Sequence, residues 1–262
     1  MERTKILMII ILMAHLGLTG CGGQKNDGIV RTDWSHTYEG YPVVYVARNV
    51  SADGLMSAYE SLEVSFDGTA AIKLSETGTD KGFSWAELIG ELSESLDEPV
   101  VVETSSSVDF SDYDCTIVLS HFRSHEAAGF NGAMKQTVSI SAKSETVTPL
   151  STGSDKLKKL AEKGKQTVDS LKGRVLYINV MDRATIESAG VILPDSNTYG
   201  IGVLASYDPV ALDQACIDLV SILGEGAPLL SHIEACGGLY TLAYGEQVGL
   251  GSRTYAMTVL DN

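Results

Sequence analysis

The stretch that most clearly indicates the fold is Asp114-Cys-Thr-Ile-Val-Leu-Ser-His-Phe-Arg-Ser-His-Glu126. The apolar run within it, from Thr116 to Leu119, is rich in β-branched residues and is typical of a buried strand. This strand leads directly into a glycine-rich loop. Two histidines, His121 and His125, lie between the strand and the loop, in a chain that has five histidines in all. The stretch therefore indicates both a central strand and a candidate chemical site.

Segments with strand-like and helix-like patterns alternate along the chain. Besides the strand at 115–120, the pattern predicts strands at 42–47, 62–66, 69–74, 99–103, 137–141, 174–180 and 200–205. It predicts helices at 51–59, from Ser84 to about residue 96, at 154–172 and from Asp208 to about residue 223. This alternation predicts an α/β fold, a single domain with a mostly parallel central sheet flanked by helices.

The last of these helices has clear boundary signals. Asp208 is a good N-cap, and Pro209 suits the first helical position because a nitrogen there lacks an intrahelical partner in any case. Cys216 shares a face with the apolar residues of this helix, so we expect it to point into the core. Asp213 is expected at the surface.

The N-terminal segment has the pattern of a bacterial lipoprotein signal. Residues 1–20 combine basic residues with a short apolar run, and Leu18-Thr-Gly-Cys21 resembles the lipobox, in which cleavage precedes a cysteine that becomes lipidated. We expect residues 21–40, polar and glycine-rich, to form a flexible tether, and residues 41–262 to form the domain. Lipid on Cys21 would anchor the exported protein to a membrane.

The composition limits the classes of partner that the chain can bind. The formal net charge is −15 at pH 7, so the chain should repel nucleic acid, and we expect no nucleic-acid partner. No Cys-x-x-Cys pair is present, which argues against zinc ribbons and ferredoxin-type motifs. Export would permit a disulfide between Cys216 and Cys236, while the alternative is that both are buried free thiols.

The histidine pair suggests a metal site. If the segment after Ser120 were helical, the spacing of His121 and His125 would place both imidazoles on one face, with Glu126 as an oxygen ligand or general base. A divalent metal is the cofactor that this arrangement favours. The alternative is a loop in which the same residues only hydrogen-bond a turn.

The glycine loop suggests a second kind of ligand. Gly129, Gly132 and Lys135 could bring backbone N–H groups and one ammonium group to a small anionic ligand or cofactor. The spacing differs from that of a P-loop, so this pattern does not indicate a nucleotide.

Several blocks together resemble a known family. They are Val118 to Lys135, Leu176 to Met181, Ala205 to Val220 and Val248 to Arg253. In this order they are similar to domain-of-unknown-function family 362, whose members are often labelled iron–sulfur centre proteins. The family usually carries a cysteine-bearing segment where residues 182–190 here have no cysteine. The family label implies a metal or a cluster, and some members carry a ferredoxin module, which this chain lacks. The missing cysteine segment argues against a thiolate-ligated cluster in this lipoprotein member.

Three functions stay open at this level. The first is a metal- or cofactor-binding protein, with an enzymatic role undecided. The second is a lipoprotein that binds a small anionic ligand without chemistry. The third is a degenerate family member that serves only as a scaffold.

Overall fold

A computed structural model describes residues 28–75, 84–97, 99–102, 108–140, 154–193 and 200–260. The strands are β1 (Ile29–Thr32), β2 (Ser35–Tyr38), β3 (Tyr41–Ala47), β4 (Ala70–Leu74), β5 (Val100–Val102), β6 (Cys115–His121), β7 (Arg123–His125), β8 (Gly129–Asn131), β9 (Val175–Asp182), β10 (Gly200–Ser206) and β11 (Ala256–Val259). The helices are α1 (Ala52–Glu60), α2 (Trp85–Leu88), α3 (Gly90–Ser95), α4 (Ala133–Ile140), α5 (Ser154–Ser170), α6 (Arg183–Glu187), α7 (Pro209–Ile222), α8 (Ala227–Ala235) and α9 (Gly238–Gln247).

The described strands form one central sheet and a small hairpin. The sheet has the order β1-β2-β3-β10-β9-β6-β4-β5, with β11 paired to β3. Its β9-β6-β4-β5 portion is parallel, whereas β10 pairs antiparallel with both β9 and β3. Strands β7 and β8 form the separate antiparallel hairpin. The prediction of an α/β domain with a central sheet flanked by helices is confirmed, and the parallel portion contains β6.

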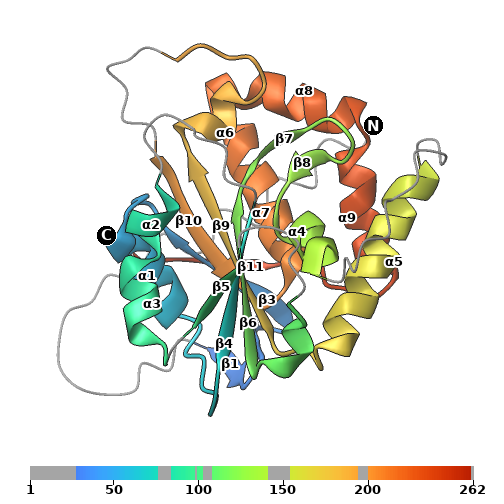
Figure 1. Ribbon diagram of the computed structural model, residues 1–262. Helices are drawn as coiled ribbons and strands as arrows, with labels where there is room; N and C mark the ends of the chain where they lie inside the picture. Colours follow the sequence, from blue (N-terminus) through green and yellow to red (C-terminus); the bar gives the residue numbers. More distant parts are fainter. Residues whose placement is uncertain are drawn as a thin grey trace.

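Each face of the sheet packs against its own group of helices (Figure 1). On one face, α1, α2 and α3 cover a core that includes Ile117 and Leu119 of β6. On the other face, α4, α5, α7, α8 and α9 cover a core that includes Val118. Adjacent residues of β6 therefore point to opposite cores, as the alternation of side chains along a strand requires. Burial on both sides explains the continuous apolar run that identified this strand.

Two sequence predictions in this region are wrong. Residues 62–66 form no strand, because the backbone turns at the end of α1 and Glu63 adopts a φ of 48°. Residues 137–141, expected as a strand, belong through Ile140 to helix α4. The start of α4 is fixed by a buried carboxylate from α7, described below, so a tertiary contact outweighs the alternating pattern.

The N-terminal prediction is partly corrected. Residues 1–27, which include the expected signal peptide and Cys21, lie outside the described residues. Within the expected tether, however, β1 and β2 pair with each other, and β2 pairs with β3. The described sheet therefore includes residues 29–38, which the sequence analysis assigned to the tether.

The helices were also compared with the requirements of a membrane span. Among the described residues, no single helix is both long and apolar enough to cross a membrane. One pair of consecutive helical segments, Pro209–Ile222 and Gly224–Ala235, is long and apolar enough when taken together, but the two segments are bent by 113° relative to each other.

Candidate functional site

The candidate site lies where β6 and β9 end. These parallel neighbours are in register, with Ser120 opposite Asn179 and His121 opposite Val180. Asp182 lies two residues beyond Val180, so its side chain is on the same face of the sheet as that of His121. The carboxyl ends of parallel strands are the usual ligand-binding edge of open α/β sheets.

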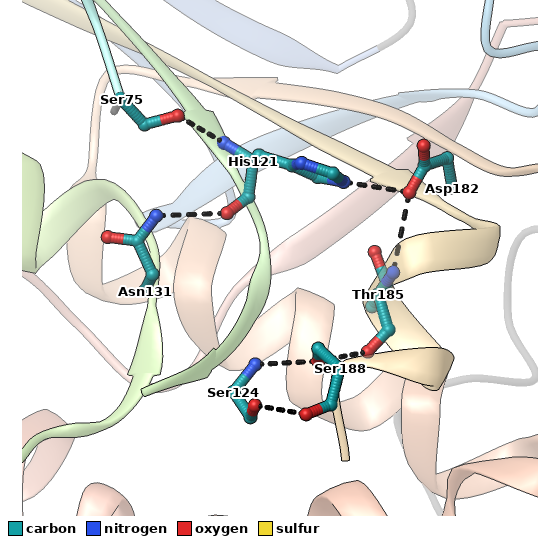
Figure 2. Close-up of polar contacts among 7 residues, drawn as sticks. All are labelled: Ser75, His121, Ser124, Asn131, Asp182, Thr185 and Ser188. Carbon is teal, nitrogen blue, oxygen red and sulfur yellow. Dashed lines mark hydrogen bonds and ion pairs between the residues drawn. The ribbon is translucent and has the colours of Figure 1, made fainter. Parts of the chain in front are cut away.

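His121 and Asp182 form a close, largely buried pair (Figure 2). His121 Nε2 lies 2.7 Å from Asp182 Oδ1, with side-chain exposures of 5% and 13%. Asp182 is also the N-cap of α6, where Oδ1 accepts a hydrogen bond from the Thr185 backbone N–H at 3.3 Å. One carboxylate therefore orients the imidazole and starts a helix.

The backbone of His121 is fixed on both sides. Its N–H donates to Ser75 Oγ at 3.0 Å, and its carbonyl accepts from Asn131 Nδ2 at 3.0 Å (Figure 2). These contacts come from the end of β4 and from β8. The backbone of His121 is thus anchored by two elements while its imidazole is bound to Asp182, which fixes the position of a polar side chain in the way that ligand recognition requires.

The structure does not bring His125 and Glu126 to this pair. The segment after Ser120 continues as strands β6 and β7 and not as a helix, so the helical spacing of the two histidines does not apply. His125 Nδ1 accepts from the Ala127 backbone N–H at 3.2 Å, within its own turn. Glu126 is exposed at that turn. In the part of the chain that the structure describes, no three His, Cys, Asp or Glu side chains are placed to hold a metal.

The glycines of the loop have packing roles. Gly129 has a φ of 83°, and a Cβ there would lie 3.1 Å from the Gly238 Cα and the Ile233 carbonyl. At Gly132, a Cβ would lie 2.3 Å from Asp213 Oδ1. Lys135 Nζ donates to Asn131 Oδ1 at 3.2 Å, which places its ammonium group near the residue that holds His121. Asn131 binds the backbone carbonyl of His121, on the side away from Asp182, so this contact does not bring Lys135 to the imidazole–carboxylate pair (Figure 2).

A carboxylate of the protein itself occupies the start of α4. Asp213 Oδ1 accepts from the Ala133 N–H at 2.8 Å, and Oδ2 accepts from the Met134 N–H at 2.9 Å. Asn179 Nδ2 of β9 donates to the same carboxylate at 2.8 Å. The N–H groups that the sequence suggested for an anionic ligand are thus satisfied internally.

The prediction that Asp213 is exposed is wrong, since its side chain is completely buried. Asp213 ties α7 to β9 and to the loop after β8. A sequence signal was available: Asp213 precedes Cys216 by three residues and Val220 by seven, and both are buried on the same helix. That spacing places Asp213 on the apolar face.

Burial raises the pKa of Asp213 to about 7, although hydrogen bonds from Met134, Asn179 and Ala133 act in the opposite direction. The unfolded chain ionises near the ordinary pKa of 3.8. Between these values the folded state binds more protons, so the free energy of unfolding should fall as the pH rises from about 4 to about 7. Urea titrations at about pH 5 and about pH 8 would test this, and Asp213→Asn should reduce the difference. If the stability difference between the two pH values is the same in Asp213→Asn as in the wild type, other titratable groups cause it.

The described cysteines are free thiols. Cys115 and Cys216 are buried, Cys236 is partly exposed, and no disulfide joins Cys216 to Cys236. Burial raises the pKa of Cys115 to about 12 and that of Cys216 well above its ordinary value. Cys216 points into the core, as its helical position predicted.

Comparison with known proteins gives one match. The family model described as domain of unknown function (DUF362) matches residues 71–218. The matched segment contains β6, β9 and all of β4 except Ala70, and it therefore includes both His121 and Asp182. Neither the curated proteins nor the solved structures contain a significant match.

Proposed function

The chain belongs to the DUF362 family, and we propose that it is a lipid-anchored, exported protein that binds a small ligand or cofactor at the carboxyl ends of β6 and β9. The observation that carries this proposal is the 2.7 Å contact between His121 Nε2 and Asp182 Oδ1. A buried imidazole–carboxylate pair is costly to desolvate, and its location at the ligand-binding edge of the sheet supports a functional role.

The chemistry of the ligand follows from the groups around the pair. His121 supplies a hydrogen-bonding side chain at the strand ends, and Lys135 of α4 supplies an ammonium group that is bound to Asn131, on the side of the His121 backbone carbonyl. These groups favour a small anion such as a carboxylate or a phosphate ester. His125, Glu126, Gly129 and Gly132 support the loop without converging on the pair.

An iron–sulfur cluster does not fit the residues that are described. Cys115 belongs to the core under α1–α3, whereas Cys216 belongs to the core on the opposite face of the sheet. Cys236 follows the end of α8. Because thiolate ligands must converge on one cluster, these three cysteines cannot supply a joint site, and no step of the proposed function uses one.

A ligand screen tests the proposed function. We expect the melting temperature of the native protein to rise with one class among inorganic phosphate, citrate, ATP and FMN, since a ligand that binds only the folded state stabilises it. Zinc chloride is included because a response to zinc alone would favour a metal site using His121. If none of these compounds changes the melting temperature at millimolar concentration, the scaffold alternative is favoured.

Membrane attachment has its own test. The lipobox-like Leu18-Thr-Gly-Cys21 predicts that the expressed wild-type protein partitions into detergent and carries acyl chains on Cys21. A variant without residues 1–21 should move to the aqueous phase with an unchanged melting temperature of the folded domain. Absence of acyl chains on Cys21 of the membrane-bound wild-type protein would point to an uncleaved apolar segment instead of a lipid anchor.

A further inference from the structure

The first strand of the sheet begins close in the chain to Cys21, the proposed site of the lipid anchor. Residues 22–28 separate Cys21 from Ile29, the first residue of β1. A fully extended chain spans at most about 3.6 Å per residue, so the chain from Cys21 to Ile29 covers no more than about 29 Å. Lipid on Cys21 would therefore hold Ile29 within about 30 Å of the membrane surface.

Ile29 lies at the edge of the sheet opposite the candidate site (Figure 1). In the paired strands Ile29 is opposite Tyr38, and Tyr38 is opposite Tyr41, the first residue of β3. Strand β3 pairs antiparallel with β10, and β10 pairs antiparallel with β9, so β3 runs in the same direction as β9 and β6. The start of β3 is therefore at the edge where β6 and β9 begin, whereas His121 is at the edge where they end.

The two edges are separated by the length of a strand. The in-register row that contains His121 passes through Val180 and Val203 to Ala47, the last residue of β3. Along β3, the distance from Tyr41 to Ala47 is about 20 Å, at about 3.3 Å per residue. Helix α8 lies beyond the His121 end of the sheet (Figure 1). If this end faced the membrane, the tether would have to be almost fully extended, although a flexible tether of this length has a root-mean-square span of only about 16 Å.

The edge that carries Ile29 also presents apolar side chains to solvent. Val30 of β1 is 62% exposed, and Tyr41 of β3 is 47% exposed. Apolar and tyrosine side chains are favoured at the interface between water and lipid headgroups. These two residues therefore suit an edge that lies next to a membrane.

We propose that the edge of the sheet that carries Ile29 and Tyr41 faces the membrane, and that the edge with His121 and Asp182 faces the aqueous compartment. The inference rests on the lipid anchor at Cys21, which belongs to the proposed function. It also identifies the source of the ligand. A carboxylate or phosphate ester that binds near His121 comes from solution and is not a lipid headgroup of the membrane that holds the anchor.

Energy transfer from a dye on the protein to a dye-labelled lipid measures this orientation. The expressed protein, lipidated on Cys21 and carrying Cys236→Ser to remove a partly exposed thiol, is reconstituted on phosphatidylcholine vesicles. One variant adds Asp67→Cys, at an exposed position shortly before β4 on the Ile29 edge. The matched variant adds Glu126→Cys, at an exposed position in the turn between β7 and β8. Because the two edges are about 20 Å apart, transfer from the dye at residue 67 should be at least about twofold more efficient.

A longer tether provides the control. Inserting about twenty glycine and serine residues after Asn26 should leave the protein on the vesicles and reduce the difference between the two dye positions, since the reach of a flexible chain grows with its length. If the protein stays on the vesicles and transfer from Glu126→Cys equals or exceeds that from Asp67→Cys, the proposed orientation is wrong while the anchor stands. A reversal of the order when phosphatidylglycerol is added would also overturn it, because the His121 edge would then bind a headgroup. Failure of the lipidated protein to stay on the vesicles would overturn the anchor itself, and the orientation with it.

Discussion

Replacing Asp213 with alanine is expected to lower the free energy of unfolding by about 4 kcal/mol. The carboxylate accepts hydrogen bonds from the Ala133 and Met134 N–H groups and from Asn179 Nδ2. All three donors are buried. Alanine would leave the two backbone N–H groups without acceptors and would leave Asn179 Nδ2 with only the weak acceptor Cys216 Sγ, at 3.3 Å. Each unsatisfied buried donor costs about 1–3 kcal/mol, which exceeds what is gained by no longer burying the carboxylate. Chemical denaturation of the two proteins at neutral pH measures the difference.

Two further variants make this prediction specific. Asp169→Ala removes an exposed helical carboxylate whose ion pair is with Lys165, and it should cost less than about 0.5 kcal/mol. Gly132→Ala should destabilise the wild type, because the new methyl group would lie 2.3 Å from Asp213 Oδ1. In the Asp213→Ala variant the same methyl group has space. The loss of unfolding free energy caused by Gly132→Ala should therefore be smaller there than in the wild type, by at least about 1 kcal/mol. Additive costs would show that Gly132 and Asp213 are not coupled as described.

Asp182→Asn and His121→Ala are each expected to weaken binding of the best ligand from the screen about 100-fold, or about 2.7 kcal/mol. Asparagine keeps the size of Asp182 but removes the charge that orients the imidazole. Alanine removes the imidazole itself. Because both changes disrupt one pair, the double variant should lose little more than either single variant. Isothermal titration of the wild-type protein and the three variants measures these affinities.

Ser188→Ala is the matched control for the binding prediction. Ser188 Oγ accepts from the Ser124 N–H at 2.9 Å and donates to the Thr185 carbonyl at 2.8 Å, so it belongs to the same end of the sheet (Figure 2). It has no contact with His121 or Asp182 among those described. Its loss should change affinity less than about threefold. Equal weakening by Ser188→Ala and Asp182→Asn would mean that the loop as a whole, and not the pair, determines binding.

Much of the sheet was predictable from the sequence, for a physical reason. Strands β4, β6 and β9 are buried on both faces, so their residues form continuous apolar runs bounded by turn residues. Helix α7 was equally clear, since Asp208 caps it as expected and accepts from the Val210 and Ala211 N–H groups. Local signals of this kind depend on neighbouring residues alone.

The start of helix α4 and the partner of His121 depend on contacts between residues far apart in the chain. Helix α4 has an alternating pattern, and what starts it is Asp213, about 80 residues later. The sequence predicts His121, His125 and Glu126 as site residues. The pairing of His121 with Asp182 could not be predicted from it, because Asp182 lies 61 residues beyond His121. Parallel strands bring residues together across long crossovers, and the sequence alone does not give the strand order.

The central claim is that a ligand binds where His121 meets Asp182, and imidazole NMR tests it most directly. With ¹⁵N-labelled histidine, the side-chain resonances of His36, His121, His125 and His232 can be followed while the best ligand from the screen is added. The account predicts that the His121 resonances move in proportion to the fraction of protein that has bound the ligand. The resonances of His36, which is hydrogen-bonded to Tyr45, should stay fixed. If the protein is saturated with the ligand and the His121 resonances do not move, the account is contradicted.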